Sequence, residues 1–144
     1  TGEELAAVPS LRPDVTIIHA QQADRRGNIM MWGISGVQKE AVLAAKRVIV
    51  TVEEIVDEFE ARANTVWLPN WVIDAVCLEP GGSSPSYALG YYERDNNFYK
   101  SRDTISSDRE AFEVWMKRHV LGTQNFAEFT RSVAAAKSEG NIHG

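Results

Sequence analysis

The chain has 144 residues, enough to bury one hydrophobic core, and a single domain is expected. Its 44% hydrophobic and 24% charged residues are typical of a soluble globular protein, and no apolar run approaches the roughly 20 residues that span a bilayer, so no membrane partner is expected. The formal net charge is −5 and the basic residues are scattered along the sequence, which argues against nucleic acid as a partner.

Cys77 is the single cysteine and lies in the apolar run WVIDAVCL, so the sequence contains neither a disulfide framework nor a pair of cysteine metal ligands. A reducing cytoplasm fits this composition best. No secretory segment is visible at Thr1, and because the sequence starts without Met we expect further sequence upstream.

The first part of the sequence alternates between strand and helix patterns. Residues 14–20 (DVTIIHA) predict a strand buried on both faces, and a charged turn separates it from a second strand over residues 28–34 (NIMMWGI). Residues 35–47 then change to helical spacing, and Ser35 with Gln38 forms an S-x-x-Q capping box. The sequence therefore predicts a helix after the second strand.

A further buried strand is predicted over residues 47–52 (RVIVTV). Thr51 and Glu54 form another capping box, which predicts that a short helix begins in EEIVDEF. Residues 64–80 (NTVWLPNWVIDAVCLEP) are a β-type segment that is interrupted at Pro69. This alternation is typical of an α/β fold, and we expect a mainly parallel sheet flanked by helices.

A long loop is predicted over residues 79–103, where Gly, Pro, Ser and Tyr dominate the composition. Helices are predicted within residues 104–144, where Ser107 and Glu110 form a capping box and the last helix ends near Gly140. The apolar residues expected to face inward in these C-terminal helices are Phe112, Trp115, Met116, Val120, Phe126, Phe129 and Val133. We interpret residues 1–144 as one domain with a helical tail.

Six segments stand in a distinctive order. They are TGEELAAVPSLRPDV, ADRRGN, the Ala-rich helix EAVLAAK, RVIVTVEEIV, LPNWVIDAVCLEPGG and PSYALGYYERDNNFY. In this order and spacing they resemble the A (α) subunits of family I coenzyme A transferases, with the glutaconate CoA-transferase branch as the best match. The likeness runs from Thr1 to about Arg102.

The resemblance implies a CoA-transferase α/β fold and a protein that transfers CoA between carboxylic acids together with a B-type subunit. In this family a Gly-rich loop for CoA and the oxyanion lies in the N-terminal half of the A subunit, and the nucleophilic glutamate belongs to the B subunit. Neither motif is present here, so we expect the C-terminal half of an A subunit, without a catalytic residue of its own and inactive as an isolated chain. A CoA thioester is the implied substrate, and no permanently bound cofactor is expected.

The aromatic loop holds the candidate substrate-binding residues. Its hydroxyls and amide suit hydrogen bonds, and the guanidinium fork of Arg94 matches both oxygens of a substrate carboxylate. The alternative is that Arg94 pairs with Asp95 or Glu93 and only fixes the loop. The side chains that we expect to contact substrate are those of Ser84, Ser86, Tyr87, Arg94 and Asn96.

The ADRRGN turn holds the candidate contacts for CoA. Ligands of α/β sheets commonly bind beyond the carboxyl ends of strands, which would bring Arg25, Arg26 and Asn28 to a CoA phosphate. The alternative is architectural: Asp24 and Asn28 cap the turn through side-chain to backbone bonds while both arginines stay solvated.

We interpret the other titratable residues as structural. Glu53 and Glu54 lie at the predicted helix start, where the helix dipole and cap account for them. His19, at the end of an apolar strand, is interpreted as a hydrogen-bonded core histidine. His119 and His143 are far apart and form no ligand pattern, so no metal site is predicted.

Two alternatives to CoA transfer stay open. Some relatives in steroid degradation resemble these A subunits but hydrolyse a ring carbon–carbon bond in a CoA thioester. The other alternative is a non-catalytic α/β module that binds a partner or oligomerises. It is favoured by the absence of the oxyanion loop, by Ser84, where many family members have His, and by Leu89, where they have His or Gln. Exposed strand edges also lead us to expect self-association.

Overall fold

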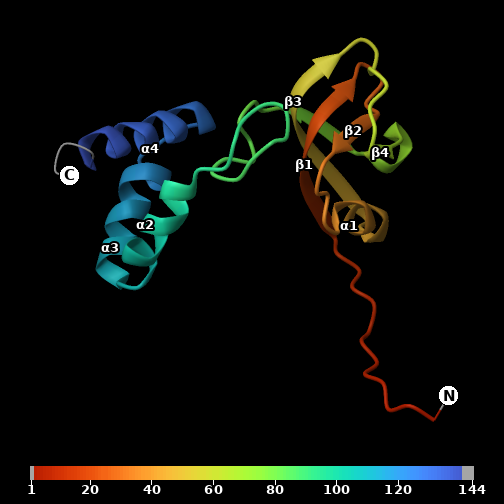
Figure 1. Ribbon diagram of the computed structural model, residues 1–144, viewed down its shortest axis with the longest axis horizontal. Helices are drawn as coiled ribbons and strands as arrows, with labels where there is room; N and C mark the ends of the chain where they lie inside the picture. Colours follow the sequence, from red (N-terminus) through yellow and green to blue (C-terminus); the bar gives the residue numbers. More distant parts are fainter. Residues whose placement is uncertain (1, 141–144) are drawn as a thin grey trace. The chain divides into compact units, whose positions relative to one another are not determined.

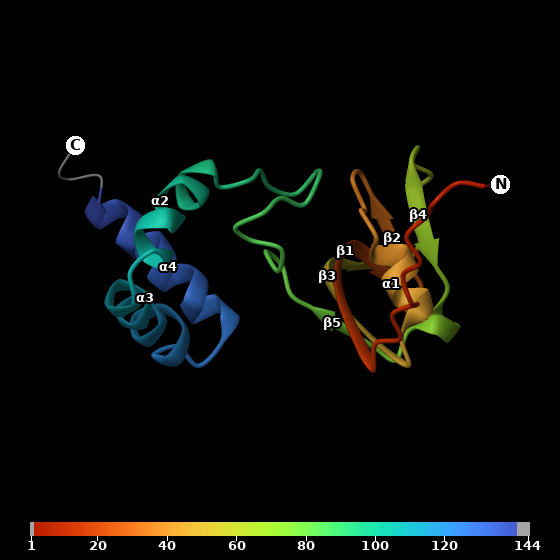
Figure 2. The ribbon, with the colours of Figure 1, turned by 90° about the horizontal axis from the view of Figure 1, so that it is seen from below.

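The structure, a computed structural model, describes residues 2–140. Its internal contacts divide the chain into a sheet unit, residues 1–95, and a helical unit, residues 96–144. Figure 1 labels strands β1 to β4 and helices α1 to α4, and Figure 2 also labels β5.

The sheet unit is built on five strands in the order β4-β2-β1-β3-β5. The strands are β1 (Val15–Asp24), β2 (Ile29–Trp32), β3 (Arg47–Val56), β4 (Thr65–Leu68) and β5 (Ala75–Leu78). Strands β1, β3 and β5 pair in parallel, while β2 pairs antiparallel with both β1 and β4. Four strands therefore point the same way and only β2 is reversed, which confirms the predicted α/β fold and its mainly parallel sheet.

One face of the sheet is covered by helix α1 (Gln38–Ala44), which lies beside the strands in Figure 1. The Thr16 hydroxyl on β1 donates to the carbonyl oxygen of Ala41 in α1, at 3.0 Å. Apolar side chains from four strands and α1 form the core on this side. Its members are Ile18, Ala20, Ala23, Ile29, Met31, Val42, Val48, Val50, Val52 and Leu68.

The opposite face of β1 is only partly covered, so the prediction of a strand buried on both faces is wrong at Val15 and Ile17. Ile17 is 68% exposed. The loop that follows β5 covers this face at the level of His19, where the backbone of Gly82 lies directly against the imidazole ring. The strand is therefore enclosed on both sides only near its middle.

Strand β3 continues through the segment predicted as a helix start. It runs from Arg47 to Val56 and pairs with β1 in parallel register from Val15↔Arg47 to Asp24↔Val56. The helix predicted from Thr51 and Glu54 is therefore wrong, because nine ladder pairs and a β-branched run outweigh a local cap pattern. Glu53 and Glu54 thus project from a strand.

The side-chain hydrogen bonds predicted by the other two capping boxes do not form either. Helix α1 begins at Gln38 without a side-chain cap, and the N–H of Gln38 bonds instead to the backbone carbonyl of Ser35 at 3.1 Å. In the helical unit, Asp108 rather than Ser107 caps helix α3, since its carboxylate accepts from the N–H of Ala111 at 2.8 Å. The helices themselves lie where the sequence predicts them.

The residues after β4 connect it to β5, which is followed by the long loop. Pro69 precedes a short 3-10 helix, η1 (Asn70–Val72), which separates β4 from β5 as the sequence predicts. The loop after β5 is shorter than the predicted range, because helix α2 (Asn96–Ser106) begins inside it. The Ser84–Pro85 peptide bond in this loop is cis.

The helical unit contains α2, α3 (Arg109–Met116), a π-helical turn η2 (Lys117–Leu121) and α4 (Phe126–Gly140), which pack together in Figure 2. Trp115 joins the helices, with ring centroids 6.4 Å from both Phe98 and Phe129. Phe112 and Val120 are exposed, against the prediction. The π-helical turn shifts the buried face, so that His119 is buried in place of Val120.

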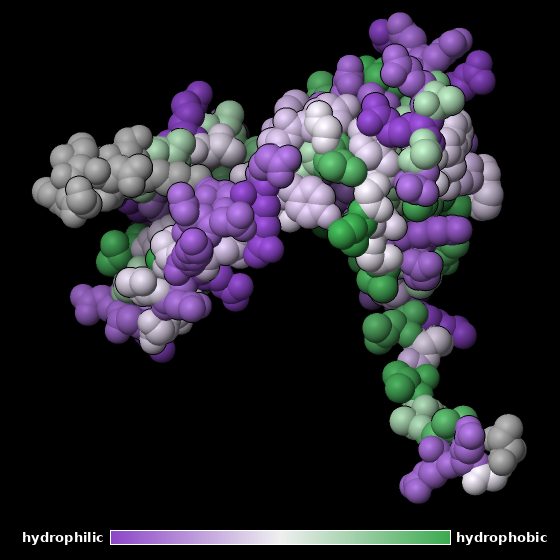
Figure 3. Space-filling model, in the orientation of Figure 1, coloured by the Kyte–Doolittle hydropathy of each residue, from purple (hydrophilic) through white to green (hydrophobic). Residues whose placement is uncertain are grey.

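Apolar side chains are also exposed on the sheet unit, as the green surfaces of Figure 3 show. Residues 2–13 form an extended segment without helix or strand, in which Leu5, Val8 and Leu11 are exposed. Within residues 2–140, no helix has the length and apolar character needed to cross a membrane.

Candidate functional site

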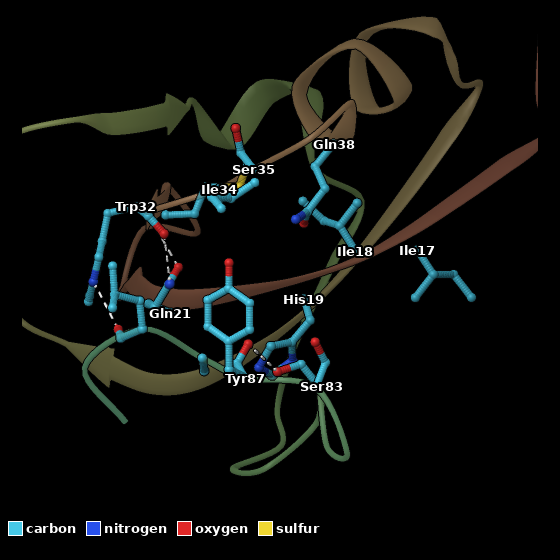
Figure 4. A pocket seen from close by; sticks show the side chains of 14 residues that line it. Ile17, Ile18, His19, Gln21, Trp32, Ile34, Ser35, Gln38, Ser83 and Tyr87 are labelled. Atoms are coloured by element: carbon cyan, nitrogen blue, oxygen red, sulfur yellow. Dashed lines mark hydrogen bonds between the residues drawn. The ribbon is translucent and has the colours of Figure 1, made fainter. Parts of the chain in front are cut away.

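A cavity of about 310 Å³ lies in the sheet unit between strand β1, the end of β2, the start of α1 and the loop after β5. Figure 4 shows it from close by, with the Tyr87 ring and the His19 imidazole on the loop side and Gln38 on the α1 side. Its walls are apolar where Ile17, Ile18 and Leu89 contribute. A half-apolar cavity of this size is typical of a small-molecule site.

The polar groups of the cavity wall are hydroxyls, amides and one imidazole. They belong to His19, Gln21, Ser35, Gln38, Ser83, Ser86 and Tyr87. No Lys, Arg, Asp or Glu is among the described residues that line it. Such a wall suits an uncharged, hydrogen-bonding part of a ligand, because a carboxylate here would lose water without gaining a cation.

One wall of the cavity is braced by Gln21 and Trp32. The Gln21 amide donates to the Trp32 carbonyl at 3.0 Å and accepts from the Trp32 N–H at 3.2 Å. The Trp32 indole N–H then donates to the carbonyl of Leu89 at 2.9 Å. These bonds, dashed in Figure 4, tie the loop to the end of β2.

Gln38 contributes the one buried side-chain polar atom without a partner among the described residues. Its Oε1 is enclosed and accepts no hydrogen bond from the protein. A buried acceptor without a donor costs free energy, roughly 1–3 kcal/mol. An N–H or O–H group of a bound molecule, or a water, would satisfy it.

His19 is held between two side chains of strand β3. Its Nδ1 lies 2.8 Å from the Thr51 hydroxyl and its Nε2 lies 2.6 Å from Oε1 of Glu53. Both ring nitrogens are therefore occupied, which confirms the sequence interpretation of a hydrogen-bonded histidine. The ring is fixed in orientation and lines the cavity with its edge.

The Glu53 carboxylate accepts hydrogen bonds from both the sheet and the loop. Its side chain is 3% exposed, and besides His19 it accepts from the Gly81 N–H and the Tyr92 hydroxyl, both at 2.7 Å. Burial and then the hydrogen bond to Glu53 raise the pKa of Tyr92, so its hydroxyl stays protonated and donates. The carboxylate is thereby satisfied on both oxygens.

Tyr92 links Glu53 to the cavity wall through hydrogen bonds. Its hydroxyl oxygen accepts from the Ser83 N–H at 3.0 Å and lies 2.7 Å from the Ser83 hydroxyl. The Ser83 hydroxyl lies 3.1 Å from the carbonyl of Tyr87. A continuous set of bonds therefore leads from Glu53 to the loop residues that line the cavity.

Glu54, the next residue of β3, has a different environment. It is exposed and accepts from the Gln22 amide at 3.2 Å and from the Tyr91 hydroxyl at 2.9 Å. Burial, followed by the bond to Glu54, raises the pKa of Tyr91 to about 12. Two neighbouring Glu–Tyr pairs thus differ in the burial of the carboxylate. The Tyr91 ring also lies against the cavity wall, with its centroid 6.2 Å from that of Trp32.

The structure brings together only part of the predicted substrate-binding set. Ser86 and Tyr87 line the cavity, whereas Ser84 and Arg94 are exposed and are not among its lining residues. Asn96 begins helix α2 and belongs to the helical unit. A substrate role for these five residues stays a prediction.

The predicted CoA-contact residues lie in the turn between β1 and β2, outside the cavity wall. Asp24 accepts from the backbone N–H groups of Arg26 and Asn28, at 2.8 and 2.9 Å, as the architectural alternative predicts. Asn28 also accepts from the N–H of Asn70 at 2.9 Å, which links the turn to η1. The exposed Arg25 pairs with Asp57. A contact with CoA stays a prediction.

Glu53 and Gln38 are the site residues that sequence reasoning missed. The one available signal was the acidic pair that follows a β-branched run, which fits a strand whose successive side chains alternate between faces. No group of three His, Cys, Asp or Glu side chains suited to a metal ion occurs in the described part of the chain.

Comparison with known proteins gives consistent results. Residues 1–79 match the coenzyme A transferase family. The chain is 62% identical to the A subunit of 3-oxoadipate CoA-transferase from Pseudomonas knackmussii, over 95% of this chain and 49% of that protein. It is 28% identical to the cholesterol ring-cleaving hydrolase IpdA subunit of Mycobacterium tuberculosis, over 85% of this chain and 44% of that protein.

Two solved structures share the fold. The crystal structure of glutaconate coenzyme A-transferase from Acidaminococcus fermentans matches with a TM-score of 0.79 and 37% identity, over 94% of this chain and 43% of that one. The crystal structure of a variant of the decarboxylase AibA/AibB matches with a TM-score of 0.61 and 31% identity, over 76% and 41%. The chain spans about half the length of the curated relatives it matches, or less. Because the family match extends over more than half of the sequence, the chain belongs to the coenzyme A transferase family and is a homologue of its A subunits.

Proposed function

We propose that this chain is part of a CoA-transferase A subunit that, together with a B-type subunit, transfers CoA between carboxylic acids, with 3-oxoadipate as the acceptor acid. The observation that carries the proposal is the 62% identity to the A subunit of 3-oxoadipate CoA-transferase over 95% of the chain. The glutaconate enzyme is less similar, at 37% identity.

The chemistry divides between the two chains in this proposal. A glutamate of the B-type subunit attacks the thioester carbonyl and releases CoA thiolate, which leaves an acyl-glutamyl anhydride. The thiolate then attacks the glutamyl carbonyl, releases the donor acid and gives an enzyme thioester. The acceptor carboxylate reverses these steps, leaves as the new acyl-CoA and restores the glutamate. Glu53 of this chain is unsuited to the attack, because it is buried and both oxygens accept hydrogen bonds. The uncharged cavity wall suits the carbon chain or thioester part of the substrate, while the carboxylates would lie outside it.

The ring-opening hydrolase alternative has weaker support. The IpdA subunit of Mycobacterium tuberculosis shares 28% identity with this chain, less than half of the value for the 3-oxoadipate relative. Both chemistries use a CoA thioester, so the difference lies in the acceptor: a second acid for the transferase, and water for the hydrolase.

The test is an acceptor panel with the protein carrying this chain, assembled with a B-type subunit. CoA transfer from an acyl-CoA donor is measured with 3-oxoadipate, glutaconate and a monocarboxylic acid, and a cyclic diketone thioester is offered without any acid. We expect kcat/KM to be highest for 3-oxoadipate, by at least about tenfold, which is about 1.4 kcal/mol of transition-state binding.

Two results would reject the proposal. Water-dependent ring opening of the diketone thioester, without transfer to any acid, would assign the hydrolase chemistry. Absence of both reactions in the assembled protein, with binding of a partner retained, would assign a non-catalytic module.

A further inference from the structure

We propose that Glu53 is a positioning residue whose buried carboxylate fixes the loop wall of the cavity, residues 81–92, so that the substrate's acyl part meets an ordered set of hydroxyls. This inference rests on the proposed function for its substrate. Its structural part, the anchoring of the loop by Glu53, can be measured independently of any reaction.

Burial makes the Glu53 carboxylate depend on its hydrogen-bond donors. A buried carboxylate is costly unless hydrogen bonds replace its water. Here the replacements are His19 on β1 and two groups of the loop, the Gly81 N–H and the Tyr92 hydroxyl. Moving the loop away would leave the carboxylate without two of its three donors, so the loop and the sheet are held together.

Hydrogen bonds also connect this anchor to the cavity. Tyr92 accepts from the N–H of Ser83, and the Ser83 hydroxyl lies within hydrogen-bond distance of the Tyr87 carbonyl. The loop between these points has no helix or regular strand of its own, apart from a single bridge between Ala88 and Tyr92. The side-chain bonds of Ser83 and Tyr92 therefore add to backbone bonds of the loop, such as that from the Ser86 N–H to the Ser83 carbonyl at 2.8 Å, in holding the groups that line the cavity.

The loop backbone approaches the His19 ring closely at Gly82. A Cβ built on Gly82 would lie 2.7 Å from His19 Nδ1 and 2.9 Å from the Glu79 carbonyl oxygen. His19 cannot turn aside without breaking its bonds to Thr51 and Glu53. The loop backbone thus contacts the His19 ring, and the bond to Glu53 helps to fix the orientation of that ring.

The experiment compares two variants of the anchor, Glu53→Gln and Tyr92→Phe, with one matched control, Glu54→Gln. Glu53→Gln keeps the shape of the side chain but places an N–H₂ group where one oxygen accepted, so one loop bond is lost. Glu54→Gln makes the same change one residue further along at an exposed site. Tyr92→Phe removes the hydroxyl that donates to Glu53.

The structural readout is amide hydrogen exchange at Gly81 and Ser83 in the chain. We expect exchange at both amides to accelerate by about tenfold or more in Glu53→Gln and Tyr92→Phe, and by less than about twofold in the Glu54→Gln control. Unchanged exchange in the Glu53 and Tyr92 variants would overturn the anchoring itself.

The functional readout is the split between KM and kcat in the assembled protein, with 3-oxoadipate as acceptor. We expect KM to rise by about tenfold in Glu53→Gln and Tyr92→Phe, with kcat within about threefold of the wild type, and both constants of the Glu54→Gln control to be unchanged within about twofold. Because both residues act through the same loop, the double variant should be no worse than about twofold beyond the single ones.

The outcomes separate the two proposals. Faster exchange with an unchanged KM would mean that Glu53 is only structural and would overturn the inference. If the wild-type protein transfers no CoA, the proposed function fails, and the loss of affinity for 3-oxoadipyl-CoA in calorimetry then decides the positioning role. If Glu53→Gln does not fold, Tyr92→Phe, which removes only a hydroxyl, gives the same decision.

Discussion

The position of Gly82 shows how tightly the loop is fitted to His19. Its φ is outside the left-handed region, so the requirement for glycine here is space and not backbone conformation. The imidazole below it is bonded at both nitrogens and cannot yield. A single methyl group at this position would therefore push the loop away from the sheet.

We predict that Gly82→Ala destabilises the chain by about 1–3 kcal/mol, the usual cost of overpacking a tight contact. It should also raise KM for the acceptor acid, since the loop carries the cavity hydroxyls. Urea unfolding and steady-state kinetics measure the two effects. Unchanged stability and an unchanged KM in Gly82→Ala would show that the contact has no importance.

For single residues, sequence reasoning identifies His19 as hydrogen-bonded but does not identify Glu53 as its partner. The groups that satisfy Glu53 lie 28 to 39 residues away, at Gly81, His19 and Tyr92. No local pattern encodes such distant contacts. The hydroxyl-rich loop is recognisable from composition, which explains why sequence reasoning finds Ser86 and Tyr87 but not Glu53.

At the scale of elements, the turn between β1 and β2 is stabilised chiefly by one side chain. Asp24 accepts two backbone N–H groups and the Asn28 amide, the last at 2.7 Å. Burial would raise the pKa of Asp24, but the bonds from Asn28 and Arg26 outweigh it and lower the pKa below 3.8. The charged form is therefore the one that stabilises the turn.

We predict that Asp24→Ala lowers the free energy of unfolding by about 1–2 kcal/mol at neutral pH, because it removes three hydrogen bonds that are partly exposed to water. A lowered pKa in the folded state stabilises the protein above pH 3.8, and this contribution disappears as the pH falls through the folded value. The difference between variant and wild type should accordingly narrow below pH 3.8 in urea titrations.

The control for this turn is Asp57→Ala. Asp57 pairs with Arg25, but both side chains are exposed, so its removal should change stability by less than about 0.5 kcal/mol. A loss as large as that of Asp24→Ala would mean that the arginine pair, and not the Asp24 bonds, holds the turn.

Strand and helix positions are largely predictable from periodicity, but the end of β3 is not. Thr51 and Glu54 satisfy a helix-cap pattern, yet Ile55 and Val56 continue the β-branched run and pair with β1. Parallel pairing depends on a partner strand more than 25 residues away in the sequence. The helix-cap pattern therefore fails where a long-range ladder competes with it.

For the whole molecule, the α/β fold and the family are predictable because several motifs stand in a fixed order. Two features are not. The division into a sheet unit and a helical unit depends on contact density, which composition does not reveal. The cavity requires β1, the end of β2, α1 and the loop at once, and no sequence segment contains all four.

The partner and the oligomeric state are also properties of the whole molecule. The relatives at 62% and 37% identity are both A subunits by name, which supports a B-type chain as partner. Exposed apolar side chains on the free face of β1, Val15 and Ile17, provide surface for association. Association with a B-type chain, and self-association of the isolated chain, both remain predictions.

The most direct test of the proposed site is a crystal structure of the assembled protein with a bound 3-oxoadipyl-CoA analogue. We predict that the acyl or thioester part lies in the cavity, within hydrogen-bond distance of the Ser86 or Tyr87 hydroxyl, with the Glu53 bonds to Gly81 and Tyr92 intact. A ligand bound elsewhere, with the cavity empty or filled by protein side chains, would contradict it.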